Sequence, residues 1–87
     1  MEEKIRFDSL KAWQSFAIAK IIALLSKTTD EKAKTDLELL LQRIQHTNFY
    51  SMPAVLLRIY AVAEKYEMKE LLETIPNDEE LFEIMKH

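Results

Sequence analysis

The sequence predicts an all-α fold: a compact bundle of four to five helices, in which three long helices are followed by one or two short ones. Two observations favour this fold. Apolar residues recur along nearly the whole chain at the spacing of one helix face, and helix-capping signals separate these periodic stretches. The 87 residues are 48% hydrophobic and 31% charged, which is typical of one globular domain. We therefore expect a single helical domain over residues 1–87, in which residues 1–8 form an extended N-terminal arm.

The first helix is expected to run from about Ser9 to Ser26. Either Asp8 or Ser9 can cap it, because each side chain can accept a hydrogen bond from an unpaired amide of the first turn. Ahead of this cap, Ile5 and Phe7 alternate with charged residues. We expect these two apolar side chains to dock the arm on the bundle.

The second helix is expected to begin at residues 28–31, where Thr28 and Glu31 have the spacing of a capping box. It should end near His46. Asn48 is the residue expected to adopt a left-handed conformation after the helix, because the chain contains no glycine. The core stripe of this helix follows the spacing of one face and consists of Ala33, Leu37, Leu40, Leu41 and Ile44.

The third helix is expected to open at Ser51, with Ser51 as its cap and Pro53 in its first turn. Tyr50 is expected to pack on Val55 as a hydrophobic staple. The helix should end at about Tyr66. Its inward face consists of Met52, Val55, Leu56, Ile59, Val62, Ala63 and Tyr66.

The C-terminal part of the chain predicts a short segment over residues 68–75, stopped by Pro76. Asn77 and Glu80 then have the spacing of a second capping box. The last helix is expected over residues 78–86. Its buried side chains are expected to be Leu81, Phe82 and Met85.

Missing residue types exclude several chemistries. The chain has no cysteine, which excludes disulfides and thiolate sites, and no glycine, which excludes Gly-rich phosphate loops. The two histidines, His46 and His87, lie in no metal-binding or histidine–carboxylate motif. The C-terminal glutamates, Glu80 and Glu83 among them, are expected on solvated faces. We therefore predict no catalytic, cofactor-binding or metal-binding residue, no small-molecule substrate, and a protein that is not an enzyme.

The same sequence features favour a cytoplasmic location. The first eight residues are too rich in charge for a signal peptide. The longest apolar stretch, Phe16–Leu25, is interrupted by Lys20 and reaches about half the length of a membrane span. We therefore expect no membrane association.

Charge is distributed unevenly along the chain. Residues 1–49 contain 8 Lys or Arg and 7 Asp or Glu, whereas residues 50–87 contain 4 and 8. The second half therefore has a net charge of −4. Such a surface does not favour binding to a phosphate backbone, because that affinity comes mainly from Lys and Arg.

A helix-turn-helix regulator that binds nucleic acid is the alternative to a protein-binding function, because a short connection joins the second and third helices. A recognition helix presents polar and basic residues on its outer face. The corresponding face of the third helix carries Arg58, Lys65, Leu57, Tyr60 and Glu64. Two cations beside apolar and acidic residues are a poor match to nucleic acid.

Surplus apolar surface is the feature that points to a function. The first helix is apolar around almost its whole circumference, which is more than a small bundle is expected to cover. Either this helix is central and enclosed by the others, or another protein chain covers part of its surface. Leu57 and Tyr60 project away from the core stripe of the third helix, and Leu39 away from that of the second. Lys20 is expected to extend along apolar surface to reach water or an acidic partner. Contiguous apolar surface of this kind is usually functional.

The sequence therefore predicts a non-enzymatic protein–protein interaction module, a homodimer or a small adaptor, inhibitor or regulator. Its interface candidates are Leu39, Leu57, Tyr60 and Lys20. The partner is expected to be a second copy of the chain. An enzyme subunit or ligand carrier is a third reading, which requires a cavity that the sequence does not reveal.

Overall fold

Five helices make up the fold seen in the computed structural model, which describes residues 5–86. They are α1 (Leu10–Lys27), α2 (Glu31–Gln45), α3 (Met52–Lys65), α4 (Lys69–Leu72) and α5 (Asp78–Met85). No strand occurs within this part of the chain. The predicted all-α fold, with three long helices followed by two short ones, is confirmed. Of the predicted arm, residues 1–4 lie outside the described residues.

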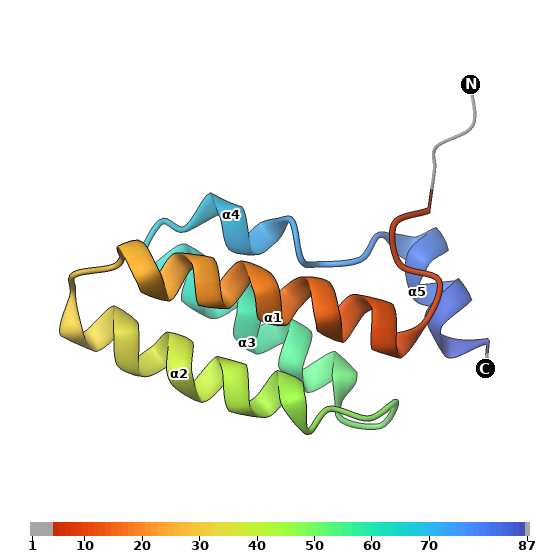
Figure 1. Cartoon of the computed structure of the whole chain (residues 1–87). Helices are drawn as coiled ribbons and strands as arrows, with labels where there is room; N and C mark the ends of the chain where they lie inside the picture. Colours follow the sequence, from red (N-terminus) through yellow and green to blue (C-terminus); the bar gives the residue numbers. More distant parts are fainter. Residues whose placement is uncertain (1–4, 87) are drawn as a thin grey trace.

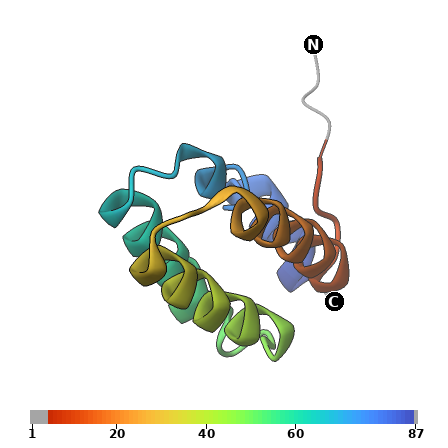
Figure 2. The ribbon, with the colours of Figure 1, turned by 60° about the vertical axis from the view of Figure 1, so that its left-hand side comes forward.

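The long helices surround the core in the order in which they follow one another along the chain. Contacts join α1 to α2, α2 to α3, α3 to α4, and α4 back to α1. Figures 1 and 2 show α1 and α2 side by side, with α4 crossing from α3 to α1. The last helix, α5, lies near the start of α1 and the non-helical residues that precede it (Figure 1). The two ends of the described chain therefore meet at one end of the bundle.

The core is built from one face of each long helix. On α1 the buried side chains follow the spacing of a single helix face. The large apolar side chains that are fully buried in the bundle are Trp13, Phe7, Ile21, Leu37, Leu40, Ile44, Met52, Ile59, Leu71 and Ile84. Trp13 also satisfies its polar group, because its Nε1–H donates a hydrogen bond to the carbonyl oxygen of Thr74 at 2.7 Å. This bond ties α1 to the segment between α4 and α5.

Two predicted caps are confirmed. The Ser9 hydroxyl accepts a hydrogen bond from the amide of Ala12 at 3.1 Å and begins α1. At the start of α5, Asn77 Oδ1 accepts from the Glu80 amide at 2.8 Å, and Glu80 Oε1 accepts from the Asn77 amide at 2.9 Å. These bonds form the reciprocal capping box that the spacing predicts.

The predicted cap of α2 is wrong. Asp30 takes this role, because its Oδ1 accepts hydrogen bonds from the amides of Lys32 and Ala33. Thr28 instead donates its hydroxyl proton to the Leu24 carbonyl of α1 at 2.6 Å. A carboxylate is an acceptor only, whereas a threonine hydroxyl can also satisfy a free carbonyl at the preceding helix end.

The connection between α2 and α3 also differs from the prediction. The side chain of Ser51 makes no capping bond to α3. Asn48 Oδ1 accepts hydrogen bonds from the amides of Tyr50 and Ser51, both at 2.9 Å, and so organises the turn. Tyr50 does not staple onto Val55, because its side chain is almost completely exposed. Asn48 does not adopt the left-handed conformation that the sequence predicts; its side chain instead stabilises the turn by hydrogen bonds to the backbone.

Glu67 is the residue that adopts the left-handed conformation in this glycine-free chain. Its φ of 54° is the one positive φ found among residues 5–86. The amide of Met68 donates to the carbonyl of Ala63 at 2.8 Å, and the amide of Glu67 donates to that of Glu64. This pattern is a Schellman motif, which satisfies the last carbonyls of α3.

Candidate interaction surfaces

Two of the predicted interface residues, including the most exposed one, lie on α3. The side chain of Leu57 is 73% exposed and that of Tyr60 is 52% exposed. Tyr60 lines a shallow groove between α3 and α4 together with Ala63 and Leu72. We call Leu57, Tyr60 and Leu72 the α3–α4 face. Charged residues of both signs, Glu64, Glu67 and Lys69, border this groove.

Leu39 lies in a different groove. It is 53% exposed and lines a groove between α2 and α3 with Arg43, Arg58 and Ala61, which we call the α2–α3 groove. The sequence placed Leu39 beside Leu57 and Tyr60 as one set of candidates. The structure instead separates Leu39 from Tyr60, since the two side chains line grooves on opposite sides of α3.

Asp36, Lys65 and Tyr66 form a polar cluster at the edge of the α2–α3 groove. The Tyr66 hydroxyl donates to Asp36 Oδ2, and Lys65 Nζ lies 3.4 Å from the same oxygen. The hydrogen bond from Tyr66 and the neighbouring Lys65 lower the pKa of Asp36, while the same hydrogen bond raises the pKa of Tyr66. The charges of Asp36 and Lys65 therefore neutralise each other.

The remaining cations of the α2–α3 groove are its two arginines. Within residues 5–86, neither Arg43 nor Arg58 forms an ion pair. Both side chains are exposed, one on each helix that forms the groove. The groove is therefore positively charged, with Leu39 and Ala61 as its apolar residues.

Lys20 finds its acidic partner within its own chain. Its Nζ lies 3.2 Å from Oε2 of Glu73 and 5.6 Å from the centre of the Phe16 ring. The aliphatic part of Lys20 is half-buried, as expected for a lysine that extends along apolar surface. This ion pair accounts for the position of Lys20 without a second chain.

α1 is not enclosed by its own bundle. Trp13, Ala17 and Ile21 are fully buried on its inner face, whereas Phe16 and Ile22 remain partly exposed on the outer face. Phe16 is covered in part by the ring of Phe7, whose centre lies 5.2 Å away in an edge-to-face arrangement. Ile22 is therefore the principal exposed apolar side chain of this helix.

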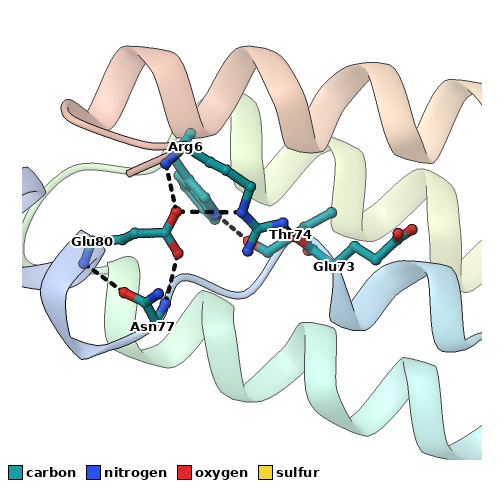
Figure 3. A network of polar contacts seen from close by, with 6 residues as sticks. Arg6, Glu73, Thr74, Asn77 and Glu80 are labelled. Carbon is teal, nitrogen blue, oxygen red and sulfur yellow. Dashed lines mark hydrogen bonds and ion pairs between the residues drawn. The ribbon is translucent and has the colours of Figure 1, made fainter. Parts of the chain in front are cut away.

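Glu80 is buried. The prediction that it lies on a solvated face is therefore wrong. It is 1% exposed, and its Oε2 accepts a hydrogen bond from the backbone amide of Arg6 at 2.9 Å (Figure 3). The Arg6 Nε lies 3.4 Å from the same oxygen. Burial raises the pKa of Glu80, but hydrogen bonds from Asn77 and Arg6 outweigh burial and hold this pKa below its ordinary value. The only sequence signal was the capping box, which leaves one carboxylate oxygen free for a second partner.

Of the three residues of α5 predicted to be buried, Leu81 is partly buried against the core, whereas Phe82 and Met85 point outward. Phe82 is 67% exposed and Met85 is also exposed, whereas Glu80 and Ile84 are buried. Phe82 lines a shallow concavity with Ile5 and the acidic residues at the start of the helix. We define the α5 outer face as Asp78, Glu79, Phe82 and Glu83.

No group of three or more His, Asp or Glu side chains in residues 5–86 is arranged to hold a metal ion. His46 is exposed at the end of α2, where its backbone amide donates to the carbonyl of Gln42. None of the helices in this range combines the length and apolar composition that a membrane span requires. Comparisons of the chain with protein-family models, with curated proteins and with solved structures find no match.

Proposed function

We propose that this protein is a non-enzymatic protein–protein interaction module that forms a two-fold homodimer through the α3–α4 face. The observation that carries the proposal is the exposure of Leu57 and Tyr60, 73% and 52%, on neighbouring turns of a core helix. Leu72 of α4 extends this apolar surface. Adjacent exposed apolar side chains on a small protein usually mark a binding surface.

A second copy of the chain is the partner that this surface suits. In a two-fold contact the same face serves both chains, so one apolar patch is sufficient. The ring of Tyr60 buries a large area while its hydroxyl can reach water at the rim. The rim contains Glu64 and Lys69, so residues of opposite charge are available to meet across the two-fold axis.

The alternative of a nucleic-acid regulator has weaker support. Of the two cations on the outer side of α3, Lys65 is paired with Asp36, which leaves Arg58 without an ion pair among the described residues. Glu64 lines the groove on the other side of this helix and is exposed, so that side adds an acid rather than a cation. A phosphate backbone requires several unpaired cations on one surface.

Sedimentation of the wild type and of Leu57→Glu tests the proposal. The substitution places a charge where the contact excludes water, and we expect the dimer to weaken roughly a hundredfold. Helical content measured by circular dichroism should not change, because Leu57 is exposed within the chain. Ile22→Glu is the matched control, since it puts the same charge on an exposed apolar residue of α1.

Two results would contradict the proposal. One is a wild-type protein that sediments as a monomer at high micromolar concentration. The other is dissociation by Ile22→Glu but not by Leu57→Glu, which would assign the contact to α1. Tight and salt-sensitive binding of a DNA duplex by the wild type would favour the nucleic-acid regulator instead.

A further inference from the structure

Two surfaces of opposite charge on this chain have no partner within it. The α2–α3 groove presents Arg43 and Arg58 around Leu39 and Ala61. The α5 outer face presents an exposed phenylalanine among carboxylates. Among residues 5–86, no ion pair joins the two surfaces, and the Lys65–Asp36 pair in the α2–α3 groove leaves both arginines without an ion pair.

The α2–α3 groove has the chemistry to bind an acidic helix that carries one apolar side chain. Arg43 projects from α2 and Arg58 from α3, so the two guanidinium groups belong to opposite walls. Ala61 is small, which leaves space between the helices for a side chain of the partner. Asp36 is paired with Lys65 and also interacts with Arg58, but this one carboxylate is outnumbered by the three cations that line the groove, so the groove stays positively charged.

The α5 outer face matches these requirements. Phe82 is 67% exposed, although a side chain of this size normally avoids water. Glu79 and Glu83 are one helical turn apart and line the same concavity as the Phe82 ring. The described residues that line this face include three carboxylates, those of Asp78, Glu79 and Glu83, and no cation.

The inner side of α5 fixes the direction in which Phe82 points. Glu80 is bound to Arg6, and Ile84 belongs to the hydrophobic core, so both hold α5 against the rest of the chain. The hydrogen bond between Trp13 and Thr74 anchors the segment that leads into α5. The outer face is thus presented to other molecules on a fixed support.

We propose that the α2–α3 groove of one copy binds the α5 outer face of a second copy, with Phe82 between the helices and carboxylates of α5 paired with Arg43 and Arg58. The contact joins two different surfaces, so it is head-to-tail. The bound pair still presents one free groove and one free α5 outer face, so association continues copy after copy unless a ring closes. This contact uses neither Tyr60 nor Leu72 and goes beyond the two-fold dimer proposed above.

Cross-linking between introduced cysteines tests the contact directly, because the chain contains no cysteine of its own. One variant carries Leu39→Cys in the groove, and the other carries Met85→Cys at the edge of the α5 outer face. A short bismaleimide should link the two variants when they are mixed and should give far less product with either variant alone. Raising the salt concentration should reduce this mixed product, because exposed ion pairs are screened.

Charge reversal shows whether the arginines and the carboxylates make the contact. Arg43→Glu with Arg58→Glu in the Leu39→Cys chain should reduce the mixed product about tenfold or more, because acids would then face acids. Glu79→Arg with Glu83→Arg in the Met85→Cys chain should restore it. Lys11→Glu with Lys34→Glu is the matched control, which changes the net charge equally but outside the groove, and should leave the product unchanged.

The proposal is overturned if no mixed product forms, if its yield does not depend on salt, or if the control reduces it as much as the arginine reversals do. Cross-linking of a Leu57→Cys variant to itself tests the two-fold dimer separately. Failure of one contact is therefore distinguishable from failure of the other.

Discussion

The carboxylate of Glu80 accepts a hydrogen bond at 2.9 Å from the backbone amide of Arg6, a residue 74 positions earlier in the chain. Its other oxygen accepts from the amide of Asn77 at 2.9 Å. The Arg6 guanidinium in turn donates to the carbonyl of Glu73 at 3.0 Å. One buried carboxylate therefore caps α5 and fixes the start of the described chain against it (Figure 3).

Replacing Glu80 with glutamine should destabilise the protein by about 1–3 kcal/mol, because the amide group faces donors that a carboxylate satisfies. Urea unfolding followed by circular dichroism measures this change. Glu79→Gln is the control, since Glu79 is exposed on the same helix, and should change stability by less than about 0.5 kcal/mol. Equal effects of both substitutions would show that the carboxylate of Glu80 is not the group that holds α5.

Acid should remove the contribution of Glu80 to stability. Its pKa is lowered from an ordinary value of 4.5, so the folded state binds this proton less readily than the unfolded state does. The stabilisation is complete above about pH 4.5 and is lost as the pH falls through the lower pKa of the folded state. Asp36, whose pKa is also lowered, acts in the same direction.

The free energy of unfolding, measured between pH 6 and roughly pH 3, tests this assignment. Glu80→Gln should flatten the acid dependence, and the part that remains should include the contribution of Asp36. A wild type and a Glu80→Gln variant that lose stability in parallel over this range would contradict it.

Asn48→Ala should cost about 1 kcal/mol, because the side-chain oxygen of Asn48 satisfies two amides ahead of α3. Ser51→Ala should cost less. The Ser51 hydroxyl accepts one hydrogen bond, from the amide of Asn48, and makes no capping bond to α3, whereas Asn48 satisfies two amides. Chemical denaturation of the two variants measures both losses of stability. A larger loss for Ser51→Ala would show that the Ser51 side chain caps α3, as the sequence spacing predicts.

Local signals predict most of the fold but not its charged contacts. The caps at Ser9 and at Asn77 lie within three residues of their partners, so spacing alone locates them. The burial of Glu80 and the exposure of Phe82 depend instead on Arg6, which the fold brings to α5 from the other end of the chain. The Lys20–Glu73 ion pair also depends on the fold, which brings the segment after α4 next to α1.

The sequence likewise predicts only part of the candidate surfaces. Helical periodicity identifies Leu39, Leu57 and Tyr60 as residues that point away from the core, and all three are exposed. Periodicity within one helix cannot say which residues of different helices share a groove. The separation of Leu39 from Tyr60, and the joining of Arg43 to Arg58, follow from how α2, α3 and α4 pack.

Glu67→Gly should stabilise the protein by about 0.5–1 kcal/mol. A side chain with a Cβ atom is disfavoured in the left-handed conformation by roughly 1–2 kcal/mol, and the greater freedom of glycine in the unfolded chain offsets part of the gain. Removing the Glu67 charge near the end of α3 also helps, because that end carries partial negative charge. Glu67→Ala separates the two effects, since it removes the charge but keeps Cβ. Thermal or urea unfolding should therefore rank glycine above alanine. If alanine stabilises as much as glycine, the gain comes from the charge, and the φ of 54° costs the fold nothing.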